Sequence, residues 1–173
     1  MTFLLPAAGT VCAQELAANV VELTYPVVEL VYRVESVEGK VTKLAIKETA
    51  TETRIEVPAD ILFDFDKADI RPAAAEALQQ VSQILRERAR GKVRIEGHTD
   101  AKGTAAYNKT LSEHRADSVR RWLVEHEGLD KAKLTIQGHA ATDPVAANTK
   151  PDGSDDPDGR QKNRRVEIVI GKQ

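Results

Sequence analysis

Asp100 and Arg115 are the two residues whose types and spacing best suit binding chemistry. Arg115 lies in a helical pattern in which Leu111, Val119 and Leu123 recur at core-facing positions. A guanidinium in such a stripe must either extend to water along its methylene stem or meet a fixed acceptor. Asp100 lies 15 residues earlier, in a loop just before the expected helix. Together the carboxylate and the guanidinium could hold a zwitterionic ligand.

Each of these residues also has an ordinary structural explanation. Asp100 could cap the helix that follows it, and Arg115 could simply extend to solvent. Gly103, Asn108 and the position between a strand and a helix favour a ligand site over these explanations. A guanidinium offers a planar fork to a carboxylate, and a carboxylate accepts hydrogen bonds from an ammonium group. The predicted ligand therefore carries both groups on one carbon, as the end of an amino acid does.

The acidic and histidine residues are not spaced as a metal site. Asp64, Asp66 and Asp69 follow one another like calcium ligands, but the segment lacks the turn glycine and the closing glutamate of an EF-hand. The histidines show no HExxH-type spacing; they are His98, His114, His126 and His139. From local spacing we expect no metal and no cofactor. Spacing does not address residues that folding brings together.

The arrangements typical of hydrolases are not found in the sequence. Glu96 and Asp100, at the end of one strand, would be separated by roughly 13 Å if extended, which is too far for the paired carboxylates of a glycosidase. The sequence has no GxSxG elbow and no glycine-rich phosphate loop. Ser112 has no neighbouring base except His114, whose ring points elsewhere on the helix. We therefore expect a binding protein and not an enzyme.

The elements expected to position Asp100 and Arg115 alternate between strands and helices. A short strand at 61–66 precedes a helix that begins near Pro72 and ends at Gly91. The later elements are a strand at 92–98, a helix ending near Gly128, a strand at 134–138, a long polar loop at 140–163 and a strand at 165–170. This βαβαβ-loop-β order predicts an α/β (α+β) fold, a two-layer sandwich of a small mixed β-sheet and two main helices.

The first 57 residues differ in character from the rest of the chain. Residues 1–13 are apolar and uncharged, and Val11-Cys12-Ala13 suits a small-residue cleavage site, so we expect a truncated signal peptide. Residues 14–57 form a predicted β-rich extension with strands at 28–34, 44–46 and 55–57. The main domain is expected at 58–173.

The composition argues against a nucleic-acid partner. The 173-residue chain has a net charge of −2 and only 4% aromatic residues. It therefore lacks both the basic excess and the stacking side chains that such proteins use.

Three stretches resemble the OmpA-like C-terminal domain family, and they follow the order seen in that family. They are ILFDFDKADI at 61–70, GHTDAKGTAAYNKTLSEHRADSV at 97–119 and GRQKNRRVEIVI at 159–170. The resemblance implies a periplasmic domain, associated in some members with the outer membrane, that binds peptidoglycan without covalent attachment. One departure is that Gly138 is followed by His139 and Ala140 in place of the Gly-x-Gly common in the family.

The resemblance also implies which residues bind the wall. Asp100 would accept from the ammonium group and Arg115 would bind the carboxylate at the free end of meso-diaminopimelate in the stem peptide. The other implied pocket residues are Phe65, Asp66, Thr99, Asn108, Asn163 and Arg164.

Three functions stay open at this point. The first is a peptidoglycan-binding module that anchors the envelope, or an outer-membrane or other envelope protein, to the wall. The second is a cell-wall hydrolase that uses the same pocket, and the third is a structural envelope protein that does not bind the wall.

Overall fold

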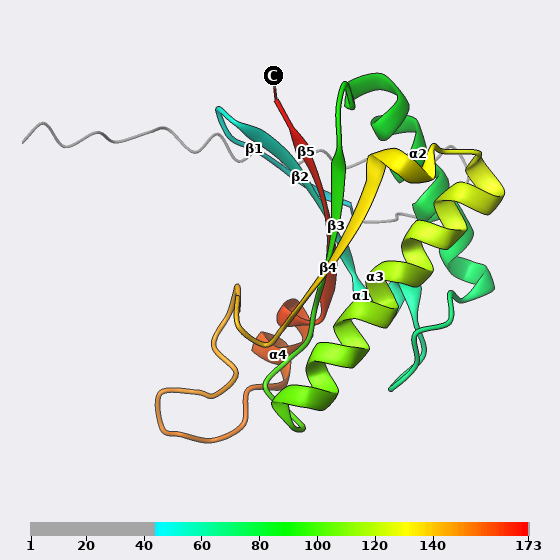
Figure 1. Cartoon of the computed structure of the whole chain (residues 1–173). Coiled ribbons are helices and arrows are strands. Elements are labelled where there is room, and N and C mark those ends of the chain that lie inside the picture. The colour runs from blue at the N-terminus through cyan, green and yellow to red at the C-terminus, as the bar shows by residue number, and fades with distance from the viewer. Residues whose placement is uncertain (1–43, 173) are drawn as a thin grey trace, which may run out of the picture.

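The computed structural model describes residues 44–172, which fold around one five-stranded sheet (Figure 1). The strands are β1 (Ala45–Glu48), β2 (Glu52–Pro58), β3 (Val93–His98), β4 (Leu134–Ala140) and β5 (Arg165–Gly171). Their spatial order is β1-β2-β5-β3-β4. β3 and β4 run parallel, and the other neighbouring strands run antiparallel. The predicted α/β sandwich with a mixed sheet is confirmed.

The two long helices lie on the same face of this sheet (Figure 1). The helices of the described residues are α1 (Ala59–Leu62), α2 (Ala75–Arg88), α3 (Ala105–Glu127) and α4 (Pro157–Asn163), with single 3-10 turns at Pro72–Ala74 and Lys131–Lys133. The predicted helices near Pro72 and before Gly128 correspond to α2, with its preceding turn, and to α3. Within residues 44–172, no helix is both long and apolar enough to span a membrane.

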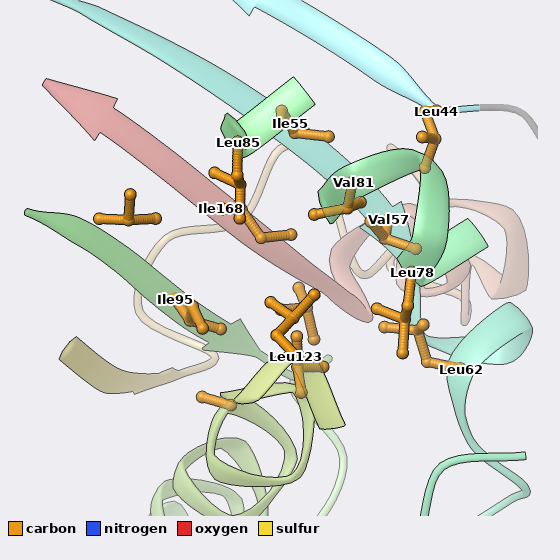
Figure 2. Packing of buried hydrophobic residues seen from close by; sticks show 14 of the residues in the cluster. Leu44, Ile55, Val57, Leu62, Leu78, Val81, Leu85, Ile95, Leu123 and Ile168 are labelled. Carbon is orange, nitrogen blue, oxygen red and sulfur yellow. The ribbon is translucent and has the colours of Figure 1, made fainter. Parts of the chain in front are cut away.

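Apolar side chains from the sheet and from both long helices fill the space between the two layers (Figure 2). Ile55, Ile95 and Ile168 come from three different strands and are fully buried. Leu78 of α2 and Leu123 of α3 pack against them and are also fully buried. The alternating pattern of the strands places these residues on the helical side of the sheet, so charged residues are left on the opposite face.

Two glycines let α3 lie unusually close to the sheet. A Cβ atom at Gly97 would lie 2.1 Å from the backbone oxygen of Ser112, and one at Gly138 would lie 2.5 Å from the Ser112 hydroxyl oxygen. Both distances are too short for a larger residue without movement of the helix. This close approach fixes α3, and with it Arg115, against the ends of β3 and β4.

The strand predicted at 61–66 is wrong. α1 includes Leu62, and Phe63 forms only an isolated bridge with Ile70. Leu62 and Phe63 are both buried, and a short apolar run does not distinguish a helical turn from a strand. The position beside β5 is occupied by β2, which pairs with β5 over Glu52–Pro58.

The loop predicted at 140–163 ends in a helix, which corrects that prediction. α4 begins with Pro157 in its first turn, and the Asp156 side chain accepts a hydrogen bond from the Gly159 backbone N–H at 3.1 Å. A capping aspartate followed by proline is a typical helix start. In this sequence it stands among other loop-forming residues, which masked it.

The strands predicted at 44–46 and 55–57 correspond to the β1–β2 hairpin. Leu44, Ile46, Ile55 and Val57 all contribute to the same hydrophobic core as the main helices. The strand predicted at 28–34 and the signal peptide predicted at 1–13 lie outside the described residues.

Candidate functional site

Asp100 lies in a short loop that is fixed at both of its ends. The backbone N–H of Thr99 donates to the Ala140 carbonyl at 2.8 Å, which continues the pairing of β3 with β4. The Asp100 Oδ1 atom accepts from the Lys102 backbone N–H at 2.9 Å. From α3, the Asn108 side-chain amide donates to the carbonyls of Asp100 and Lys102 at 3.3 and 2.9 Å. Asn108 therefore shapes the loop that presents Asp100.

The second carboxylate oxygen of Asp100 faces two arginines. Asp100 Oδ2 accepts from Arg164 Nη1 at 2.9 Å and lies 3.5 Å from Arg160 Nη1. Arg164 also reaches Asp60 Oδ2 with its other terminal nitrogen, at 3.3 Å. Asp100 is only 8% exposed, so these contacts compensate much of the cost of burying its charge.

Arg160 is a site residue that the sequence analysis missed. It lies on α4, four residues before Arg164, and it also forms a two-nitrogen contact with Asp155 at 2.8 and 2.7 Å. The four-residue spacing of the two arginines in the stretch GRQKNRR would have indicated a shared face, had a helix been expected there.

Arg115 is buried on the helical side of the same region. It is 5% exposed, its Nε donates to the Lys67 carbonyl at 3.0 Å, and its guanidinium carbon lies 5.1 Å from the centre of the Phe63 ring. Within residues 44–172, neither terminal nitrogen of Arg115 has a hydrogen-bond partner. The donors of these two nitrogens are therefore unused, while Nε and the ring hold the side chain in place.

The charges around Arg115 are of both signs. Burial lowers the pKa of Arg115, and the positive charge of Arg164 lowers it further. The neighbouring groups Tyr107, Asp60 and Asp66 have the opposite effect and raise the pKa of Arg115. Because an arginine stays protonated in proteins, the site holds a permanent cation among acidic neighbours. Such a mixed environment suits a ligand that is itself zwitterionic.

The structure places Asp100 and Arg115 in one region without pairing them to each other. No hydrogen bond or ion pair joins them among the described residues. Arg164 is paired with Asp100, and its positive charge lowers the pKa of Arg115. The two groups of the clamp expected from the sequence are therefore not joined directly, and the clamp stays a prediction.

Phe65 and Asp66 lie on the exposed rim of this region. Phe65 is 96% exposed and lines a hollow of about 550 Å³ together with Asp60, Arg160 and Arg164. Asp66 has a left-handed backbone with φ of 60° and accepts a hydrogen bond from the Tyr107 hydroxyl. That hydrogen bond raises the pKa of Tyr107.

Thr99 and Asn163 are buried behind the region. The Thr99 hydroxyl has no hydrogen-bond partner within the described part of the chain. The Asn163 side chain accepts from the backbone N–H groups of Val145 and Ala146 and donates to the carbonyl of Ala146 and the side chain of Asn148. Asn163 is fully buried, so it holds the preceding loop in place.

Comparison with known proteins places these features in a family context. A sequence profile described as the OmpA family matches residues 62–156. Outer membrane protein A of Bordetella avium is 40% identical over 112 residues, which cover 65% of this chain and 54% of that protein. The peptidoglycan-associated lipoprotein of Buchnera aphidicola subsp. Baizongia pistaciae is 34% identical over 109 residues, which cover 63% of this chain and 59% of that protein.

Two further matches differ in how much of the matched protein they cover. The protein named photosystem I P700 chlorophyll a apoprotein A2 in Gloeobacter violaceus is 43% identical over 136 residues, 79% of this chain, but the match covers 16% of that protein, so the name of the whole carries no argument. The solved structure of the cell wall anchor of the T6SS from Pseudomonas aeruginosa has a TM-score of 0.63 at 30% identity and covers 75% of this chain and 88% of that chain. The chain spans less than two thirds of the length of the three sequence relatives named.

Proposed function

Because this chain belongs to the OmpA family, we propose that it binds peptidoglycan non-covalently and so anchors the cell envelope, or a partner protein, to the wall. The names of two relatives support this function, since one is a peptidoglycan-associated lipoprotein and the other a cell wall anchor. We place the domain in the periplasm, in association with the outer membrane. Relatives named outer membrane protein A and peptidoglycan-associated lipoprotein support this location. The names of the lipoprotein and of the cell wall anchor both describe association with the wall and not its cleavage, which favours binding over hydrolysis.

The group recognised on the wall is the free end of meso-diaminopimelate in the stem peptide. Arg115 carries this assignment, because a nearly buried guanidinium with two uncommitted terminal nitrogens is ready to bind a carboxylate. Asp100 supplies the acceptor for the ammonium group on the same carbon. Its carboxylate has lone pairs beyond those that Arg164 and Lys102 engage, so the ammonium can be added to the existing contacts.

Co-sedimentation with insoluble sacculi tests this function. We expect the protein to pellet with sacculi that contain diaminopimelate and to bind more weakly to sacculi that contain lysine in its place, because lysine lacks the carboxylate for Arg115. Asp100→Ala and Arg115→Ala should both lose binding. Arg121→Ala is a matched control from the same helix, since Arg121 is exposed and contacts only its helical neighbours Asp117 and Ser118 among the described residues.

Each alternative gives a different result in the same experiment. Sustained clearing of a sacculus suspension by the purified protein would contradict a purely binding function and favour the hydrolase. Undiminished binding by both Asp100→Ala and Arg115→Ala would contradict the assigned clamp. If the wild-type protein neither pellets with sacculi nor binds a free diaminopimelate-containing peptide, the results would favour a structural envelope protein that does not bind the wall.

A further inference from the structure

The sheet face opposite α2 and α3 contains a second polar site, separate from the proposed wall-binding region. A hollow of about 530 Å³ lies over β2, β3, β4 and β5, and its walls include Glu96, His98, His139 and Glu167. Glu96 and His98 are two residues apart on β3, so both side chains lie on this face of the sheet. Glu167 lies on the adjacent strand β5, directly opposite Glu96 in the register. The three side chains therefore meet because two strands distant in the sequence pair side by side.

His98 is the anomalous member of this group. It is only 3% exposed, and within residues 44–172 neither of its ring nitrogens has a hydrogen-bond partner. Buried polar side chains in native proteins are normally satisfied by the protein, by water or by an ion. The His98 Nε2 atom lies 3.8 Å from Glu167 Oε1, which is too long for a hydrogen bond and close to the spacing of two ligands on one metal ion.

From this geometry we propose that Glu96, His98 and Glu167 bind a divalent transition-metal ion of the zinc type. Each residue offers one ligand atom, and the three atoms lie within 4.8 Å of one another. Shifts of about 1 Å in the side chains bring all three to the 2.0–2.2 Å that zinc requires. One imidazole nitrogen with two carboxylate oxygens suits zinc or cobalt, whereas magnesium and calcium prefer oxygen ligands alone.

His139 is stacked on His98 and could become a fourth ligand after a movement of its ring, although it lies outside the group whose atoms are within 4.8 Å. Its ring stacks on that of His98 with the centres 5.0 Å apart, and its Nε2 atom is buried without a partner among the described residues. Its Nδ1 atom contacts Asp143 at 2.7 Å. A carboxylate on the second ring nitrogen is the usual support of a metal-binding histidine, because it fixes the ring and its tautomer.

Three arginines already contact the two carboxylates, and this sets the expected strength of the site. Arg54 donates to Glu96 and Glu167, at 3.2 and 2.6 Å, and Arg165 donates to Glu167 at 2.6 Å. Arg94 donates to Glu96 at 2.9 Å. These contacts orient the carboxylates and leave each oxygen a further lone pair for the ion. The arginine charges also repel a cation, so we expect weaker binding than in a structural zinc site with cysteine ligands.

Zinc titration of tag-free, chelator-treated protein tests the site. The melting temperature should rise by about 4 °C or more once Zn²⁺ is in large excess over its dissociation constant, and Mg²⁺ should have no such effect. His98→Gln should abolish the zinc-dependent rise. His126→Gln is the matched control, since His126 is an exposed histidine of α3, and it should keep the rise.

The wild-type protein provides an independent readout in case His98→Gln folds poorly. In nitrogen NMR spectra of the histidine side chains, the His98 resonances should move first as Zn²⁺ is added below one equivalent. Absence of any shift at His98, or an unchanged zinc response in folded His98→Gln, would overturn the site and indicate a hollow filled only by water. The proposed wall-binding residues, Asp100 and Arg115, are not among the proposed metal ligands. Loss of the zinc response and loss of sacculus binding are therefore distinguishable outcomes.

Discussion

Arg164 Nη1 donates to Asp100 Oδ2 at 2.9 Å, and this ion pair ties the start of β5 to the loop that follows β3. The Asp100 charge is thus partly balanced before any ligand arrives, and Arg160 adds to that balance at 3.5 Å. A ligand ammonium must therefore share the carboxylate with a guanidinium. We infer that recognition depends on the whole charge pattern of the ligand, with its carboxylate directed to Arg115.

Replacing Asp100 by asparagine should remove the recognition of the ammonium group while keeping the loop. In Asp100→Asn the side-chain oxygen can still accept from the Lys102 N–H, and Arg164 keeps Asp60, so the free energy of unfolding should change by less than about 1 kcal/mol. Wild-type protein should bind a diaminopimelate stem peptide roughly tenfold more tightly than the same peptide without the terminal amino group. Calorimetry should find that Asp100→Asn hardly distinguishes the two peptides, and preserved discrimination would contradict the role of Asp100.

Phe65 should contribute to wall binding and not to folding. Its side chain is 96% exposed, so Phe65→Ala should change the free energy of unfolding by no more than about 0.5 kcal/mol. If it lines the pocket as the family resemblance implies, sacculus binding should nevertheless fall. Val145→Ala is a suitable control because Val145 is another exposed apolar residue, 48% accessible, and it should leave binding unchanged. Equal binding by the two variants would remove Phe65 from the site.

Local patterns were sufficient for the parts of the fold that depend on neighbouring residues. The apolar stripe of α3 and the alternation of β3 predicted both elements, and the motif around Asp100 and Arg115 pointed to the region that holds them. These features follow from periodicity and from side-chain type, which a single sequence records directly.

Contacts between distant residues explain what the sequence could not predict. β2 pairs with β5 across more than a hundred residues of sequence. Local patterns therefore could not show that β2, and not the apolar run at 61–66, lies beside β5 in the sheet. The family resemblance implies that Asn163 is a pocket residue, but its amide is fully engaged by the loop around Ala146 and Asn148. The convergence of His98 and Glu167 likewise depends on the pairing of two strands.

Gly97 should be intolerant of even the smallest side chain. A Cβ there would lie 2.1 Å from the Ser112 backbone oxygen, and a backbone atom within a helix cannot move aside as a flexible side chain does. Gly97→Ala should therefore destabilise the protein by about 3 kcal/mol, seen as a lower midpoint of urea unfolding. Gly171→Ala is the matched control, because nothing lies within 4 Å of its added Cβ, and its midpoint should stay close to that of the wild type. Similar midpoints for both variants would contradict the close helix–sheet contact.

His98 should make the stability of the metal-free protein depend on pH. The pKa of His98 is lowered from 6.5 to about 4, chiefly by burial and then by the charge of Arg165, while Glu167 and Glu96 oppose the shift. The charged and titratable groups around its hollow are Arg54, Arg94, Glu96, His139, Asp143, Arg165 and Glu167. The unfolded chain, with a histidine pKa near 6.5, binds the proton more readily than the folded chain. The contribution of His98 is therefore complete above pH 6.5 and is lost as the pH falls towards 4.

Urea unfolding in the presence of EDTA, at a series of pH values from 7 to 4, measures this contribution. A pKa difference of that size corresponds to a loss of at most about 3 kcal/mol over the range. Other carboxylates titrate in the same range, so the relevant quantity is the difference between wild type and His98→Gln, whose stability should fall less steeply with acid. His126→Gln should follow the wild-type curve, since His126 is exposed. Parallel curves for wild type and His98→Gln would mean that the folded protein holds His98 in an environment where it protonates as readily as in the unfolded chain.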